Sequence, residues 1–142
     1  MKVMVLVKAT AATEAGRLPT EQEIGAMCAY NTQLVQAGIM LAGEGLHPTS
    51  RARRVAFGGG APQVIEGPFA GPRDLVAGFW LWQVRSLDEA TEWLKRAPFG
   101  PDDVVELRPI LGPEDFGAAL TPELRAQEQR LRDQIDTHDP TR

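Results

Sequence analysis

The stretch that decides the fold is EGPFA at residues 66–70, which leads into GFWLW at residues 78–82. A glycine followed by a proline predicts a tight turn, because Gly67 allows a positive φ and Pro68 fixes the next φ. The direction of the Glu66 carboxylate is therefore expected to be well determined. The segment that follows this turn is the most aromatic one in the chain, and it predicts a strand.

Bulky side chains occupy both faces of this predicted strand. Trp80 and Trp82 alternate with Phe79 and Leu81, a pattern typical of a central strand that is covered on both sides. Helices are expected to cover one face. A second subunit is the simplest cover for the other face, so the sequence predicts a homodimer.

The remaining elements follow from periodicity and capping residues. Thr20 and Ser86 each precede a helical pattern with a glutamate three residues later, which is typical of a helix N-terminus. The first of these helices is expected to bury Ile24, Met27, Cys28, Leu34 and Val35. The predicted strands are residues 3–7, 39–46, 55–57, 63–65, 78–85 and 104–111, and the predicted helices are residues 20–37, 86–97 and one that starts at Thr121.

This order of elements is typical of one fold. Strand, helix, strand, an inserted hairpin, strand, helix and strand is the α+β, ferredoxin-like βαββαβ plan. Helices would cover one face of the antiparallel sheet, and the other face would present a polar and aromatic set to a cleft or a partner subunit. That set is Trp80, Trp82, Glu44, Glu106 and Arg108. Residues 1–112 are expected to form this domain, and residues 113–142 a C-terminal extension with one helix.

Composition narrows the class of protein. The chain has 142 residues and a net charge of -4, so it lacks the basic excess that direct nucleic-acid binding requires. Cys28 is the single cysteine, which suits a reducing compartment. No apolar run approaches the roughly 20 residues of a membrane span, and the N-terminus has no secretory pattern. A cytoplasmic protein without a membrane partner is therefore expected.

Two residues are candidates for acid–base chemistry. His47 follows a predicted strand and would act as a base if it reached the carboxylate of Glu66 or Glu44; the alternative is a histidine on a surface loop. Glu66 could equally form an ion pair with Arg73 or Arg108. The two histidines and one cysteine show no ligand spacing, so no metal and no other cofactor are expected.

The candidates for ligand binding lie around the turn and on the aromatic strand. Asn31 falls in the apolar stripe of the first helix, where it either points into a site or is a buried amide satisfied by the backbone. The proposed binding set comprises Glu44, Glu66, Arg73, Asp74, Trp80, Trp82 and Arg108.

Several ordered landmarks carry a resemblance to a known family. The segments at residues 66–70, 78–80 (GFW), 86–90 (SLDEA) and 105–109 (VELRP) resemble the DGPF-domain branch of the YCII-related family, over most of residues 1–111. The resemblance implies a dimeric α+β barrel of ferredoxin-like subunits. It also implies a genomic association with extracytoplasmic-function sigma factors, and some relatives in the wider family resemble enzymes acting on small ring compounds.

The departures from the family pattern concern its chemistry. The branch usually has an aspartate where this chain has Glu66. The wider family carries a catalytic histidine on the first helix, and the nearest position here is Met27. The aspartate of its Asp-Pro-aromatic segment is replaced by Ala97, before Pro98 and Phe99. A histidine–aspartate pair of that kind therefore cannot be carried over to this chain.

Two functions remain open from the sequence. One is a small-molecule-binding or regulatory dimer linked to sigma-factor signalling. The other is a cofactor-independent enzyme of the lyase, isomerase or dehalogenase type that acts on a small polar or aromatic substrate. It would use His47 or Glu66 as the acid or base, and the tryptophans of the aromatic strand as a stacking wall.

Overall fold

The computed structural model describes residues 1–138, which form two compact units, Met1–Ile110 and a second that begins at Leu111. The predicted division into residues 1–112 and 113–142 stays a prediction, and the last four residues of the extension lie outside the described ones. No helix within residues 1–138 combines the length and the apolar character needed to cross a membrane.

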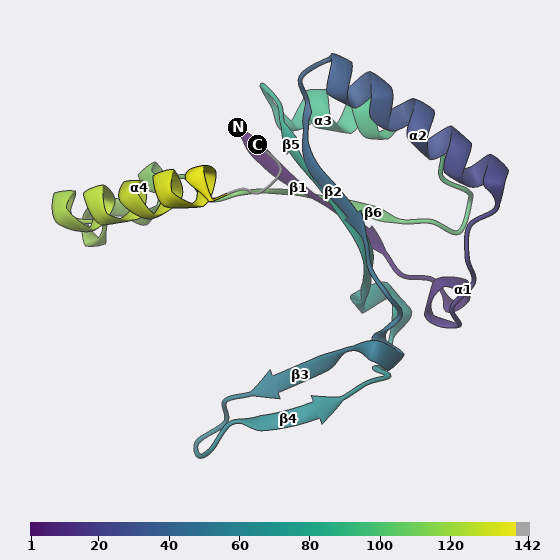
Figure 1. Cartoon of the computed structure of the whole chain (residues 1–142), viewed down its shortest axis with the longest axis horizontal. Coiled ribbons are helices and arrows are strands. Elements are labelled where there is room, and N and C mark those ends of the chain that lie inside the picture. The colour runs from purple at the N-terminus through teal and green to yellow at the C-terminus, as the bar shows by residue number, and fades with distance from the viewer. Residues whose placement is uncertain (139–142) are drawn as a thin grey trace. The chain divides into compact units, whose positions relative to one another are not determined.

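A four-stranded antiparallel sheet is the centre of the first unit (Figure 1). Along the chain, the four strands and the helices α2 and α3 follow the order β1, α2, β2, β5, α3 and β6. A hairpin is inserted between β2 and β5. This arrangement confirms the predicted ferredoxin-like plan with an inserted hairpin. Across the sheet, the strand order is β2 (Met40–Gly45), β5 (Val76–Gln83), β1 (Lys2–Lys8) and β6 (Val105–Pro109).

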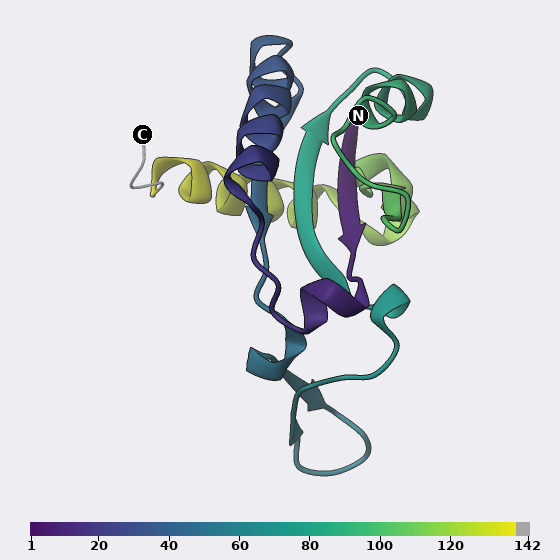
Figure 2. The ribbon, with the colours of Figure 1, turned by 90° about the vertical axis from the view of Figure 1, so that its right-hand side faces the viewer.

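The helices α2 (Glu21–Gln36) and α3 (Leu87–Leu94) lie on the same face of this sheet (Figures 1 and 2). Both begin as the sequence predicted, because the hydroxyls of Thr20 and Ser86 accept hydrogen bonds from the backbone N–H groups three residues later, at 3.2 and 3.1 Å. Helix α2 ends before Gly38, whose φ of 72° is the left-handed conformation typical of that position.

The buried face of α2 differs from the predicted one. The stripe that faces the sheet contains Tyr30 and Leu34, which are buried, with Met27 and Asn31 beside them. Three residues of the predicted stripe are exposed instead: Ile24, Cys28 and Val35. The apolar residues of α2 define two adjacent stripes at helical spacing, and the contact of Tyr30 with the sheet selects between them.

The core lies between the sheet and the two helices. Trp80 and Trp82 face this core, opposite Val5 and Val3 of β1, and Trp82 is fully buried. The prediction that both tryptophans lie on the face away from the helices is therefore wrong. Both faces of β5 are bulky, so alternation alone could not assign them. The larger apolar area of tryptophan is buried under the helices. The core comprises Val3, Val5, Tyr30, Leu34, Ile39, Trp80, Trp82, Val84 and Ala90.

The opposite face of the sheet, here called the open face, is covered by no helix of the first unit (Figure 1). The prediction holds for Glu106 and Arg108, which lie opposite Leu6 and Met4 of β1, and for Glu44, which lies opposite Phe79 of β5. Glu106 pairs with Arg108 and, at 3.6 Å, with Lys8. The open face therefore mixes apolar side chains with charges of both signs.

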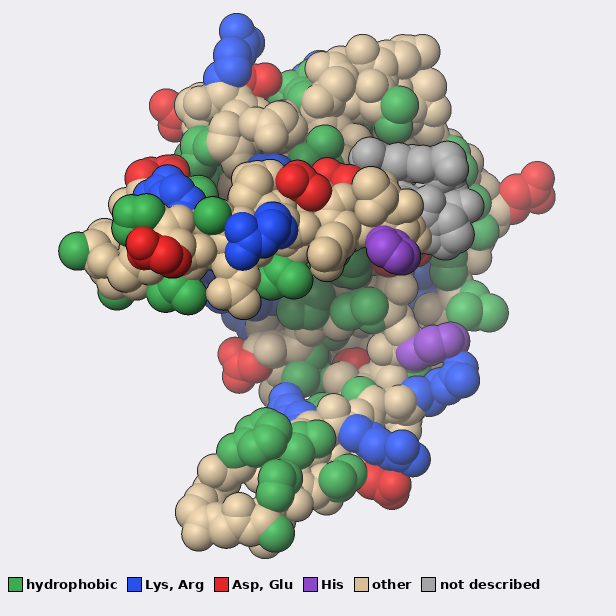
Figure 3. All heavy atoms as spheres, turned by 60° about the vertical axis from the view of Figure 1, so that its left-hand side comes forward, with side chains coloured by type: hydrophobic (Ala, Val, Ile, Leu, Met, Phe, Trp, Pro, Cys, Tyr) green, Lys and Arg blue, Asp and Glu red, His purple; other side chains and the backbone are tan. Residues whose placement is uncertain are grey.

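The inserted hairpin, here called the arm, pairs β3 (Arg53–Ala56) with β4 (Gln63–Glu66). Every residue of both strands is exposed, and apolar side chains gather on the arm's surface (Figure 3). The short helix α1 (Ala11–Glu14) holds its base, because Thr49 donates its N–H and its hydroxyl to the Glu14 carboxylate, at 3.1 and 2.5 Å. The hydroxyl of Thr49 also accepts a hydrogen bond from the N–H of Phe69, at 3.0 Å.

The second unit contains α4 (Pro122–Thr137), with Thr121 as its N-cap and a proline at the first helical position, as the sequence predicted. Its apolar stripe is thin and exposed. That stripe consists of Leu124, Leu131 and Ile135.

Candidate functional site

The turn at residues 66–70 owes its shape to close packing. Gly67 does not adopt the positive φ that a glycine allows; the left-handed residue in this region is Gly71, with a φ of 79°. A glycine is needed at position 67 for another reason: a Cβ there would lie 1.7 Å from the backbone oxygen of Thr49. The turn is therefore a packing contact between the two ends of the arm.

Glu66 lies at the surface of the arm. Its carboxylate pairs with Arg53 at 3.5 Å, and the two side chains are 75% and 72% exposed. The alternative pairings with Arg73 or Arg108 do not form, since Arg108 pairs with Glu106. Around this pair is a hollow of about 540 Å³, here called the Glu66 hollow, lined by Ser50, Arg51, Ala52, Arg53, Glu66 and Gly67. No aromatic residue lines it.

His47 lies apart from both carboxylates. Its ring is exposed, and Nε2 lies 3.1 Å from the Nη1 atom of Arg51. Within residues 1–138, no hydrogen bond or ion pair joins His47 to Glu66 or Glu44. The base oriented by a carboxylate, which the sequence suggested, is not formed in this structure.

The remaining polar candidates are distributed over separate surfaces. Arg73 and Asp74 are exposed in the short helical turn Pro72–Asp74, and neither lines a hollow described here. Arg108 is on the open face. Among the predicted binding residues, only Glu44 and Trp80 line the same hollow.

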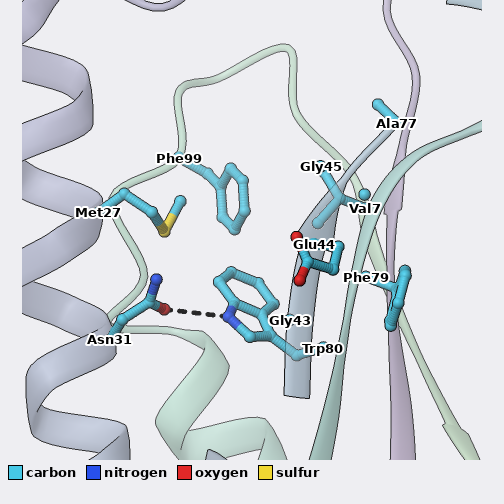
Figure 4. A pocket seen from close by; sticks show the side chains of 11 residues that line it. Val7, Met27, Asn31, Gly43, Glu44, Gly45, Ala77, Phe79, Trp80 and Phe99 are labelled. Atoms are coloured by element: carbon cyan, nitrogen blue, oxygen red, sulfur yellow. Dashed lines mark hydrogen bonds between the residues drawn. The ribbon is translucent and has the colours of Figure 1, made fainter. Parts of the chain in front are cut away.

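These two residues line a hollow of about 300 Å³ at the edge of the sheet, here called the Trp80 hollow (Figure 4). It lies where the edge strand β2 and the strand β5 meet the helix α2 and the loop before β6. Its lining residues are Val7, Met27, Asn31, Gly43, Glu44, Gly45, Ala77, Gly78, Phe79, Trp80 and Phe99.

The indole of Trp80 is held from several directions. Its Nε1–H donates to the Oδ1 atom of Asn31 at 3.0 Å. The rings of Tyr30 and Phe99 each meet it edge to face, with ring centroids 6.0 Å away. Such aromatic pairs contribute about 0.5–1.5 kcal/mol beyond the area they bury. The indole is therefore a fixed wall of the hollow, and Asn31 is neither a backbone-satisfied amide nor a surface residue.

Glycines in β2 and β5 make room for this arrangement. Gly43 lies opposite Trp80, and a Cβ at position 43 would lie 2.6 Å from the Cδ1 atom of the indole. A Cβ at position 45 would meet no heavy atom within 4 Å. Gly43 therefore lets the indole lie against the backbone of β2, whereas Gly45 borders empty space.

Glu44 is the only titratable residue among the eleven that line the Trp80 hollow. Glu44 is exposed and lies opposite Phe79 of β5, so its side chain leaves the edge strand β2 on the face away from Trp80 and lines the hollow from the edge of the sheet (Figure 4). Within residues 1–138, no ion pair involves Glu44. The hollow thus combines aromatic walls, one amide and one carboxylate without a bound counter-charge. No group of three or more potential metal ligands occurs in the same part of the chain.

Tyr30 supports the hollow from the core. Its hydroxyl donates to the backbone oxygen of Trp93 at 2.6 Å. Burial raises the pKa of Tyr30 to about 12, against a smaller opposing effect of the Arg96 charge. The phenol is therefore neutral near pH 7, and its role is structural.

Sequence reasoning missed Phe99 and Gly43 as site residues. Phe99 had a signal, because it ends the segment that stands where the family has Asp-Pro-aromatic. Met27, which stands at the family's histidine position, lines the same hollow. The close approach of Gly43 to Trp80 depends on the strand register, for which the sequence has no local signal.

The fold and this hollow define the class: an α+β protein with a ferredoxin-like sheet and a ligand-sized hollow at the sheet edge. Residues 1–114 match the YCII-related domain, and the chain belongs to that family. The match does not separate the branches of the family, so membership of the DGPF-domain branch stays a prediction.

Two further comparisons carry no argument about this chain. The chain is similar to the solved structure of 5-chloro-2-hydroxyhydroquinone dehydrochlorinase from Burkholderia phenoliruptrix, in complex with 2,5-dihydroxybenzoquinone. The sequence identity is 18%, the match covers 80% of this chain and 98% of that chain, and the TM-score is 0.43. At this level, the likeness carries no weight for the chemistry of this chain. No curated protein matches the chain.

Proposed function

We propose that this protein binds a small organic molecule in the Trp80 hollow. The observation that carries the proposal is the lining itself, since aromatic and apolar walls surround two polar side chains, Asn31 and Glu44. Ligand sites in proteins have this composition, and about 300 Å³ is at the lower end of their usual volume. The Glu66 hollow is larger, but its walls are exposed polar side chains and backbone.

Binding without catalysis accounts best for the polar groups present. Acid–base catalysis generally uses two groups that exchange protons with the substrate, and Glu44 is alone in the hollow. Met27 occupies the position where the wider family has its histidine. The regulatory role linked to extracytoplasmic-function sigma factors, and the cytoplasmic location, rest on the sequence predictions alone.

A homodimer is part of the proposal. Met4, Leu6, Phe79 and Leu81 share the open face and are only partly buried, although they lie in the middle of the sheet. A two-fold interface must be complementary to itself, and the charges of both signs on this face meet that requirement. Sedimentation should give a dimer that Leu6→Asp converts into a folded monomer. A monomeric wild-type protein would contradict this part of the proposal.

The test of binding is a thermal-shift screen of small acids, phenols and amines. The hits are then repeated on Gly45→Leu, which places a side chain in the empty space of the Trp80 hollow, and on Glu66→Gln, which alters the arm. We expect hits to disappear with Gly45→Leu and to persist with Glu66→Gln. The opposite pattern would move the site to the arm, and a screen without hits would contradict a binding role for these compound classes.

One observation favours a second function. The Glu44 carboxylate lies beside aromatic walls, so it could serve as a single general base in a cofactor-independent lyase or isomerase. This version replaces His47 and Glu66, the groups suggested by the sequence. Turnover of a hit followed by NMR, and lost in Glu44→Gln while binding is retained, would support it. Unchanged ligand after prolonged incubation would favour binding alone.

A further inference from the structure

We infer that the ligand of the Trp80 hollow is a small organic cation, an amine with an apolar or aromatic body. This inference rests on the proposed function, because it names the ligand class of the same hollow. Three independent features carry it: the uncompensated charge of Glu44, the aromatic walls, and the orientation of the Asn31 amide.

Glu44 is the only charged residue among those that line the Trp80 hollow. Glu44 is exposed, and a ligand at the mouth of the hollow would remove part of the water around its carboxylate, while no arginine, lysine or histidine lines the hollow to compensate for that loss. Removing water from a carboxylate is costly unless a cation or several hydrogen-bond donors replace it. A neutral ligand would leave Glu44 poorly solvated, and an anionic ligand would add repulsion. An ammonium group supplies both the charge and the donors.

The walls of the hollow suit the same kind of ligand. The rings of Trp80 and Phe99 meet edge to face at 77°, and Trp80 is 5% exposed, so the ring of Phe99 offers the more accessible aromatic surface. The exposed Glu44 side chain lines the hollow from the sheet edge, and the thioether of Met27 lies near the two rings (Figure 4). Faces of aromatic rings attract cations, and aromatic side chains recur in sites that recognise ammonium ligands.

Asn31 provides a second point of recognition. An indole N–H can only donate, so the amide oxygen must face Trp80, which sets the position of the amide nitrogen. The two N–H donors of that amide are then left for other partners at the wall of the hollow. A hydroxyl or carbonyl oxygen on the ligand body would accept from them. The amine at Glu44 and an acceptor near Asn31 would thus fix the orientation of the ligand.

The test compares three molecules of similar shape and different charge by calorimetric titration at pH 7: phenethylamine, 2-phenylethanol and phenylacetate. We expect phenethylamine to bind at least tenfold more tightly than 2-phenylethanol, and phenylacetate to bind most weakly. Glu44→Gln should abolish the preference for the amine, whereas Glu92→Gln, the same change at an exposed residue of α3, should retain it.

The failures of the two proposals are distinguishable. Equal or tighter binding of the alcohol or the acid, or an amine preference that survives Glu44→Gln, overturns the cation assignment and leaves ligand binding in place. The cation assignment also fails if none of the three binds while other compounds from the thermal-shift screen bind in a way that Gly45→Leu abolishes. If no compound binds in either experiment, both proposals fail.

Discussion

The Glu66 hollow and the Trp80 hollow lie in the same unit and differ in how they are built. In the Glu66 hollow, exposed side chains of the arm meet in solvent, and its ion pair between Glu66 and Arg53 is more than 70% exposed on both sides. In the Trp80 hollow, an indole that is 5% exposed is fixed by an amide and two rings. A site needs groups whose positions are fixed by packing, and only the second hollow provides them.

The largest expected difference between the two regions concerns aromatic truncation. Trp80→Ala should lower the free energy of unfolding by about 3–5 kcal/mol, because it leaves a cavity in the core and removes three ring contacts. Phe57→Ala on the arm, where the side chain is 78% exposed, should change it by less than about 0.5 kcal/mol. Urea unfolding measures both values. Similar losses for the two variants would show that the arm is packed in solution.

The free energy of unfolding at high pH should depend on the ionisation of Tyr30, which supports the Trp80 hollow from the core. The pKa of Tyr30 in the folded protein is about 12, above the usual value near 10, so the folded state retains the proton longer than the unfolded state. Stability from this group is complete below about pH 10 and is lost as the pH rises toward 12, by about 2–3 kcal/mol. Urea unfolding between pH 8 and 11.5 should show the decline in the wild type and a smaller one in Tyr30→Phe. Identical slopes would contradict this assignment.

Gly43 and Gly45 of β2 differ in the space that an added side chain would meet. Gly43→Ala should cost about 1–2 kcal/mol, because the new methyl group collides with the indole of Trp80. Gly45→Ala should leave stability nearly unchanged, since its methyl group meets no atom within 4 Å. Thermal unfolding of the pair, which differ by two positions on the same face, is the measurement. A destabilisation of Gly45→Ala as large as that of Gly43→Ala would show that the hollow is closed in solution.

The smallest change in stability is expected at Glu66, the residue around which the sequence analysis was built. Glu66→Gln removes an exposed ion pair with Arg53, and such pairs contribute between about 0 and 1 kcal/mol. We expect a change in unfolding free energy below about 0.5 kcal/mol, and a smaller one still in high salt. Denaturation at two salt concentrations checks this. A larger, salt-independent loss would indicate that Glu66 has a buried partner in the assembled protein.

Much of the fold could be predicted because its signals are local. Thr20, Ser86 and Thr121 each begin a helix where their side chains suggested, and the order of strands and helices predicted the ferredoxin-like plan. The candidate site could be predicted only in part. Glu44 and Trp80 were named, but the predicted face joined two tryptophans that lie in the core to Glu44 and Arg108, which lie on the open face.

The sequence by itself determined the order of the main elements and where the helices α2, α3 and α4 begin, because capping and periodicity act over a few residues. It also marked the turn at Glu66 as a landmark of the YCII-related family. Only the tertiary structure decided which face of β5 is covered by helices and which stripe of α2 is buried. Those choices depend on contacts between segments far apart in the chain, such as Asn31 with Trp80 and Gly43 with the same indole. For that reason, the structure moves the candidate site from the turn to the Trp80 hollow.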